Sequence, residues 1–274
     1  YNDRPVGLTD PDLDFFSISP DEDFMLPTLQ ALLIQNEELD LIATNWSAPG
    51  WMITASNQTL FGGEVNAAFY DSYADYYLKF FQAYNERGIR FDYLSMQNQP
   101  HQDTVPNLTL DFPSTRWSAS DYQTFVVDHL EVKLRRRGFN PDYLVWDGNW
   151  TDDNTQNVSD IGTLAANLLN DSEYDRFVKG VAWQCYQADN GFDDYSQAFA
   201  MNIRDHQVRF LTECGNKQGS RTFGQILAQD VGDMFIGSLR ASVHAIYYGS
   251  LALDENNGPH QGGCDDCRGV ITLN

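Results

Sequence analysis

Basic residues and long apolar runs are both scarce in this chain of 274 residues. Lys and Arg together number 17 against 39 Asp and Glu, which gives a formal net charge of −22. Because proteins bind nucleic acid through clustered cations, this composition argues against a nucleic-acid partner. No apolar run approaches the ~20 residues needed to cross a bilayer, so we predict no transmembrane segment.

Cysteine and histidine are also few. Four cysteines are too few for a disulfide framework at this size. Cys264 and Cys267 form a lone C-x-x-C motif, which disfavours structural zinc and leaves open a local disulfide or two free thiols. The five His residues show no H-x-x-x-H spacing. We therefore predict that the protein holds no metal and no cofactor.

Sequons for N-glycosylation are frequent instead, although no signal peptide is recognisable. They favour a secreted, extracellular glycoprotein, and we expect Asn45 to be too buried for modification. The N-x-[ST] sequons begin at Asn45, Asn57, Asn107, Asn149, Asn157 and Asn170.

Short apolar runs rich in β-branched and aromatic residues alternate with helical periodicity, which predicts repeated βα units and a parallel sheet. Helices are expected over about 69–84, 120–137 and 222–243, with Gly88 and Gly138 just past the first two. No linker or repeat divides the chain, so we predict a single domain over 1–274. The expected strands are 39–44, 91–96, 143–146, 181–186, 208–212 and 245–253.

Six strands do not close an eight-stranded barrel, and an open edge exposes unpaired backbone groups. Two architectures remain open at this point. Either the first two βα units lie outside these 274 residues, or the strands form an open doubly wound sheet.

Polar and aromatic residues follow five of these strands. In a parallel barrel the active site lies at the C-terminal ends of the strands. Aromatic planes stack on the C–H faces of sugars, while amides and carboxylates bind the hydroxyl groups. The pattern therefore indicates a carbohydrate site built from residues 45–51, 97–100, 147–150, 184–186 and 213–215.

Five motifs follow one another along the chain. They are Thr44-Asn-Trp-Ser-Ala-Pro-Gly-Trp-Met52, Ser95-Met-Gln-Asn-Gln-Pro100, Gly180-Val-Ala-Trp-Gln-Cys-Tyr186, Leu211-Thr-Glu-Cys214 and Leu251-Ala-Leu-Asp-Glu-Asn-Asn-Gly-Pro259. In this collinear order they resemble glycoside hydrolase family 30, the family of glucosylceramidases and β-1,6-glucanases. This resemblance implies a truncated (β/α)8 TIM barrel in which the expected strands are the third to the eighth, and in which the family's β-sandwich domain is absent.

The resemblance also implies roles for individual residues. Glu213 matches the catalytic nucleophile, and Gln99 occupies the position of the general acid/base in the family's Asn-Glu-Pro motif. Asn98 would bind the sugar 2-hydroxyl and Tyr186 would orient Glu213. The remaining predicted substrate-binding residues are Trp46, Trp51, Asp147, Trp150 and Gln184.

Gln99 decides between the possible functions, because an amide cannot release a proton to a leaving group. The leading hypothesis is a retaining β-glycosidase that hydrolyses glucosylceramide or β-1,6-glucan. The alternative is a pseudoenzyme that binds glucan or acts as a decoy, and a third is an incomplete product that does not fold. Gln184 stands where the family usually has His, and Gly249 and Ser250 stand where many members have Trp-Asn.

Overall fold

The structure is a computed structural model, and it describes residues 1–2, 4–5, 7–54, 60–100, 112–149, 169–170, 174, 176–185, 203–215, 219–259 and 264–273. The chain divides into two compact units, Tyr1–Leu144 and Val145–Asn274. The division falls inside strand β3 (Asp142–Asn149) and not at a linker. The prediction of one domain over 1–274 stays a prediction.

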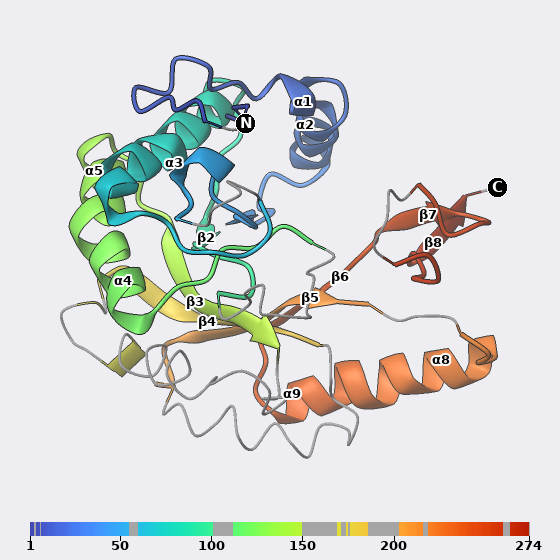
Figure 1. The fold of residues 1–274 in the computed structure, drawn as a ribbon. Coiled ribbons are helices and arrows are strands. Elements are labelled where there is room, and N and C mark those ends of the chain that lie inside the picture. Colours follow the sequence, from blue (N-terminus) through green and yellow to red (C-terminus); the bar gives the residue numbers. More distant parts are fainter. Residues whose placement is uncertain are drawn as a thin grey trace. The chain divides into compact units, whose positions relative to one another are not determined.

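Unit 1 contains the first strands of a parallel sheet and the helices that cover it (Figure 1). Strands β1 (Ile42–Thr44) and β2 (Tyr93–Ser95) pair in parallel, and β2 pairs in parallel with the start of β3. The helices are α1 (Ser19–Glu22), α2 (Met25–Gln35), α3 (Tyr70–Asn85), α4 (Ala119–Thr124) and α5 (Glu131–Arg136), with 3-10 turns at Gly50–Met52 and Ala67–Phe69 and a π-helical segment at Phe125–Leu130.

The aromatic stripe of α3 forms the core of unit 1. Tyr73, Tyr77 and Phe81 are buried on one face, as their three- and four-residue spacing predicts. Tyr73 stacks on Phe125 with ring centroids 5.0 Å apart, which ties α3 to the helix that follows β2. Gly88, just beyond α3, has φ +78°, a left-handed conformation that suits glycine.

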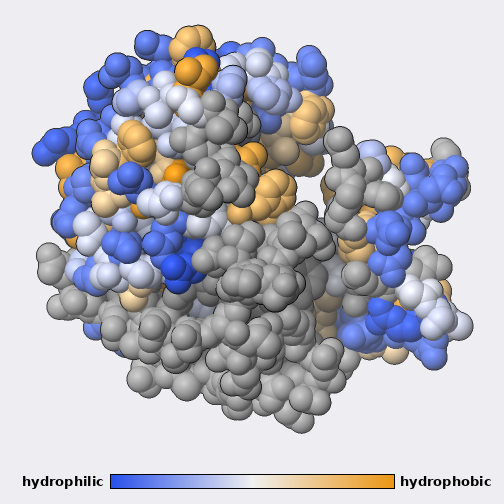
Figure 2. Space-filling model, in the orientation of Figure 1, coloured by the Kyte–Doolittle hydropathy of each residue, from blue (hydrophilic) through white to orange (hydrophobic). Residues whose placement is uncertain are grey.

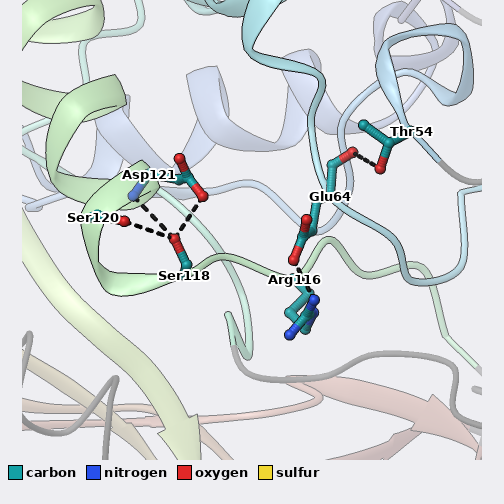
Figure 3. Close-up of polar contacts among 6 residues, drawn as sticks. All are labelled: Thr54, Glu64, Arg116, Ser118, Ser120 and Asp121. Atoms are coloured by element: carbon teal, nitrogen blue, oxygen red, sulfur yellow. Dashed lines mark hydrogen bonds and ion pairs between the residues drawn. The ribbon is translucent and has the colours of Figure 1, made fainter.

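The predicted helix over 120–137 is confirmed as the continuous run from α4 through the π-helical segment to α5. Ser118 caps its start by accepting a hydrogen bond from the backbone N–H of Asp121 at 3.1 Å (Figure 3). An ion pair between Arg116 and Glu64 joins the segment before this cap to the segment before α3. Thr54 donates to the carbonyl of Glu64 at 3.1 Å.

Unit 2 continues the parallel sheet. Strand β4 (Val178–Gln184) pairs in parallel with β5 (Val208–Cys214), and β5 pairs in parallel with β6 (Ala245–Tyr248). The helical run after β5 comprises α8 (Phe223–Gln229), a π-helical segment (Asp230–Gly237) and α9 (Ser238–Arg240). It confirms the predicted helix over 222–243, and Thr222 and Gln225 form a capping box at its start.

The hydrogen-bonded strand order is β1-β2-β3-β4-β5-β6. A doubly wound sheet reverses its strand order at a switch point, whereas a barrel keeps the order of the chain. The sequential order therefore favours the barrel architecture, with six consecutive strands of a (β/α)8 sheet. All six predicted strands are present.

The bounds of the first five strands differ from the predicted ones by up to three residues, and the sixth prediction is wrong in its extent. The expected strand over 245–253 ends at Tyr248, and residues Ala252–Asp254 form β7 in a separate two-stranded sheet with β8 (Ile271–Leu273). The reason is that β5 ends at Cys214, whose carbonyl accepts the N–H of Gly249 at 2.7 Å. Beyond that bond β5 offers no further partner.

The described surface shown in Figure 2 carries mostly hydrophilic side chains with apolar ones scattered among them. This distribution agrees with the acidic composition. Across the described ranges, no helix combines the length and apolar character needed to cross a membrane.

Candidate active site

In unit 1 the predicted site residues follow strands β1 and β2. The Asn45 side-chain amide lies 2.5 Å from the Tyr73 hydroxyl and 2.9 Å from the Tyr77 hydroxyl. The Tyr77 hydroxyl donates to the carbonyl of Met96 at 2.5 Å, and the N–H of Asn98 donates to the carbonyl of Asn45 at 2.7 Å. Helix α3 thus fixes the ends of both strands relative to each other.

Burial also fixes the charge state of these two tyrosines. It raises the pKa of Tyr73 and of Tyr77 well above the ordinary value of 10.0. Both hydroxyls therefore stay neutral and act as hydrogen-bonding supports.

Gln97 connects the two loops that carry the predicted site. Its side chain is 1% exposed, and its Nε2 donates to the carbonyl of Trp46 at 2.7 Å and to that of Asn98 at 2.9 Å. Its Oε1 accepts from Nε1 of Trp117 at 3.4 Å. The sequence places Gln97 in the predicted site range 97–100 but assigns it no role of its own. Its role as a bridge between the two loops is seen only in the structure.

Gln99 is 8% exposed and has φ +45°, in the left-handed region. A residue with a side chain adopts this conformation at a cost, which the surrounding structure must offset. The hydrogen bonds of Gln97 and Asn98 hold the chain immediately before it. The amide at the predicted acid/base position is therefore a buried group on a fixed backbone.

The two predicted tryptophans of unit 1 differ in exposure. Trp46 is 41% exposed and lies edge-to-face against Phe112, with ring centroids 6.1 Å apart. Trp51 is 2% exposed, donates its Nε1–H to the carbonyl of Asn2 at 3.2 Å and packs against Phe69. Only Trp46 presents a ring surface to solvent, and the contacts of Trp51 are those of a core residue.

In unit 2 the structure brings three predicted site residues together, from the ends of three consecutive strands. Nε2 of Gln184 lies 3.3 Å from Oε2 of Glu213 and 3.3 Å from the carbonyl oxygen of Asp147. Gln184 is fully buried, Asp147 is 2% exposed and Glu213 is half-buried. The Thr212 hydroxyl donates to the Asp147 carboxylate. Two carboxylates and one amide thus share a single polar cluster.

A disulfide joins Cys185 to Cys214, the residues that follow Gln184 and Glu213. A second disulfide joins Cys264 to Cys267, so the C-x-x-C motif forms the local disulfide and not free thiols. The sequence analysis did not anticipate the Cys185–Cys214 pair, which forms because the ends of β4 and β5 bring the two residues to a Cα separation of 4.9 Å. Within the described ranges, no group of three or more His, Cys, Asp or Glu could hold a metal ion.

The predicted site residues divide between the units. Gln99, Asn98, Trp46 and Trp51 belong to unit 1, and Asp147, Gln184 and Glu213 belong to unit 2. Trp150 and Tyr186 lie outside the described residues.

Comparison with known proteins gives a consistent result. A family model described as the glycosyl hydrolase family 30 TIM-barrel domain matches residues 1–259. Endo-1,6-beta-D-glucanase neg1 of Aspergillus fumigatus is 24% identical over 291 residues, which cover 100% of this chain and 54% of that protein. Putative glucosylceramidase 3 of Caenorhabditis elegans is 29% identical over 260 residues, which cover 88% of this chain and 46% of that protein.

Solved structures show the same fold. The endo-beta1,6-glucanase BT3312 matches with a TM-score of 0.81 and 21% identity, covering 98% of this chain and 58% of that one. SrfJ from Salmonella typhimurium matches with a TM-score of 0.78 and 24% identity, covering 96% and 55%. The chain spans about half the length of the curated relatives that it matches.

Proposed function

The chain belongs to glycosyl hydrolase family 30, and from this membership we propose that it acts on β-glucosides as a retaining β-glycosidase. The observation that carries the proposal is the cluster at the ends of β3, β4 and β5, where the Glu213 carboxylate faces the Gln184 amide beside Asp147. An amide donor stabilises the ionised carboxylate, which is the form that attacks.

Retention requires two steps at the anomeric carbon. Glu213 attacks this carbon and forms a covalent glycosyl-enzyme while the leaving oxygen departs, and water then releases the sugar. The family position for the group that protonates the leaving oxygen and activates the water is Gln99. We expect the ends of the Gln99 and Glu213 side chains to lie about 5–6 Å apart, as a retaining pair requires.

The other site residues are proposed to bind the sugar. The exposed ring of Trp46 suits stacking on a sugar face, and Asp147 is proposed to complete the same subsite. Asn98 is proposed to bind the 2-hydroxyl and Tyr186 to orient Glu213, with Trp150 and Gln184 contributing to substrate binding. Trp51, predicted from the sequence to bind substrate, is 2% exposed and is proposed to support the loop from the core instead.

We propose β-1,6-glucan as the first substrate to test and glucosylceramide as the second. Relatives named endo-1,6-beta-D-glucanase match the entire chain, and putative glucosylceramidase 3 matches 88% of it. A polysaccharide substrate fits an extracellular protein, which the sequons also favour. We expect Asn45 to remain unmodified, because its amide already contacts Tyr73 and Tyr77.

A second candidate function is glucan binding without turnover, as a pseudoenzyme or decoy. The observation that favours it is the amide at position 99, which carries no transferable proton at neutral pH. Pull-down on β-1,6-glucan together with release of reducing sugar separates the two functions. Binding with sugar release supports the hydrolase, and binding without release supports the pseudoenzyme. A circular dichroism melting curve separates both from an incomplete product, because only a folded chain unfolds cooperatively.

A further inference from the structure

We propose that the Cys185–Cys214 disulfide is a positioning element for Glu213: it pins a one-residue bulge in β5 that sets this carboxylate opposite Gln184. The inference rests on the proposed role of Glu213 as nucleophile and adds a specific structural requirement to it.

The bulge is visible from both sides of β5. On the β4 side, Trp183 pairs with Leu211 but the next residue, Gln184, pairs with Glu213. On the β6 side, Leu211 pairs with Ile246, and two residues later Tyr248 pairs with Cys214. Relative to both β4 and β6, strand β5 therefore contains one extra residue between Leu211 and Cys214. On the β4 side this residue is Thr212.

The disulfide is compatible with this bulged register and not with a regular one. In a regular ladder Cys185 would lie opposite Glu213, so its side chain would share a face with Glu213. Because side chains alternate along a strand, Cys214 would then point to the other face. In the bulged register Cys185 lies beside Cys214, and their Cα atoms are 4.9 Å apart, within the range of disulfides.

Further contacts fix the same register. The N–H of Cys185 donates to the carbonyl of Glu213 at 2.9 Å, and the N–H of Gly249 donates to that of Cys214 at 2.7 Å. The extra residue is held as well, because the Thr212 hydroxyl bonds the Asp147 carboxylate. Cys214 is fully buried, so the disulfide lies in the interior of unit 2 on its β5 side.

The consequence for the site is direct. A slip to the regular register would set Gln184 opposite Thr212 and remove the 3.3 Å contact between the Gln184 amide and the Glu213 carboxylate. The Glu213 carboxylate would then no longer be held in one orientation toward the anomeric carbon, because the end of β5 would be mobile. A displacement of this kind lowers the rate of the chemical step more than it weakens substrate binding.

The test compares two double variants of the protein, each lacking one disulfide. Cys185→Ala/Cys214→Ala removes the proposed positioning element, and Cys264→Ala/Cys267→Ala removes the disulfide near β7 and β8 as the matched control. The probe is 2,4-dinitrophenyl 2-deoxy-2-fluoro-β-glucoside, which traps a glycosyl-enzyme and needs no acid at position 99 because its leaving group departs unprotonated. The inactivation rate constant and the half-saturating probe concentration are measured separately.

We expect the first variant to be inactivated about 10- to 100-fold more slowly at saturating probe, with a half-saturating concentration changed less than about twofold. The control variant should match the unaltered protein in both constants. Equal inactivation rates in the first variant and the control would overturn the proposal. A loss confined to the half-saturating concentration would also overturn it, because that result indicates binding and not positioning.

Hydrogen exchange supplies a readout that does not depend on the chemistry. The Cys185 N–H and the amides of β5 should exchange at least about tenfold faster in the first variant and at the unaltered rate in the control. If the unaltered protein is not labelled at Glu213, the proposed nucleophile is wrong, and exchange alone decides the positioning role. Unchanged exchange in that case refutes the role, and faster exchange supports it.

Discussion

Replacing Gln99 with Glu exchanges an amide NH2 for a hydroxyl or oxygen of nearly the same size. The site is suited to this exchange, because Gln99 is 8% exposed and the preceding residue is held by the 2.7 Å bond from the Asn98 N–H to the Asn45 carbonyl. The substitution should therefore add a proton carrier with little repacking. Burial also favours the protonated form of a new carboxyl group, which is the form that a general acid needs.

The expected gain follows from the chemistry that the amide lacks. A positioned general acid or base contributes about 10²–10⁴-fold to the rate, so hydrolysis of unactivated β-glucosides should rise by that factor. This corresponds to about 3–5 kcal/mol of transition-state stabilisation. The gain should be smaller for dinitrophenyl β-glucoside in the step that forms the glycosyl-enzyme, because its leaving group departs without a proton.

The assay measures kcat/KM for methyl and dinitrophenyl β-glucosides across pH in the unaltered protein and in Gln99→Glu. A bell-shaped profile should appear only in the variant, with its basic limb reporting the new carboxyl group and its acidic limb reporting Glu213. A folded variant that binds glucan yet gains less than about tenfold on the methyl glucoside refutes the reasoning. Gln184, Gly249 or Ser250 would then also disable the site, and the pseudoenzyme would be the better description.

Three further predictions concern the nucleophile, the metal content and the carboxylate side chain of Asp10. Glu213→Gln should abolish covalent labelling by a 2-fluoro-β-glucoside, as read by peptide mass spectrometry; a label on Asp147 would overturn the assignment. Because Cys264 and Cys267 are joined in a disulfide, atomic emission should find no stoichiometric zinc in the purified protein. Burial opposes ionisation of Asp10, but three N–H donors outweigh it and hold its pKa below 3.8. Its contribution to stability is therefore present above pH 3.8 and lost as the pH falls through the lowered pKa, so Asp10→Asn should lower the melting temperature at pH 7, and this difference should shrink as the pH falls below 3.8.

Short apolar runs predicted the strands of the sheet, and hydrophobic periodicity predicted the long helices because these helices bury one face. Helix α3 is an example, with its aromatic side chains recurring on the side that contacts Phe125. Helices α1 and α2 were not predicted, although Leu26, Leu29 and Leu33 of α2 recur at three- and four-residue steps and lie in or against a core cluster. Exposed apolar residues on the same helix, such as Leu32 and Ile34, obscure this periodicity in the sequence.

The candidate site could be predicted in part for a similar reason. Polar residues at the ends of parallel strands meet at one edge of the sheet, which is how Asp147, Gln184 and Glu213 are selected and why they lie together. Exposure could not be predicted in the same way. Trp46 and Trp51 stand in one motif, yet the first is 41% exposed and the second is 2% exposed, because the turn at Gly50–Met52 directs Trp51 into the core.

The orientation of Glu213 depends on a feature that no rule of alternation supplies. Strand alternation from Leu211 assigns Glu213 a face, and one extra residue at Thr212 changes that assignment. Bulges are often marked by glycine, but Leu211-Thr-Glu-Cys214 contains none. The usable signal was instead a cysteine at the end of each of two consecutive strands. Because β4 and β5 are neighbours, a disulfide between Cys185 and Cys214 is compatible with the bulged register and not with the regular one. Cysteine spacing read against strand order, and not cysteine number, therefore carries information about where a catalytic side chain points.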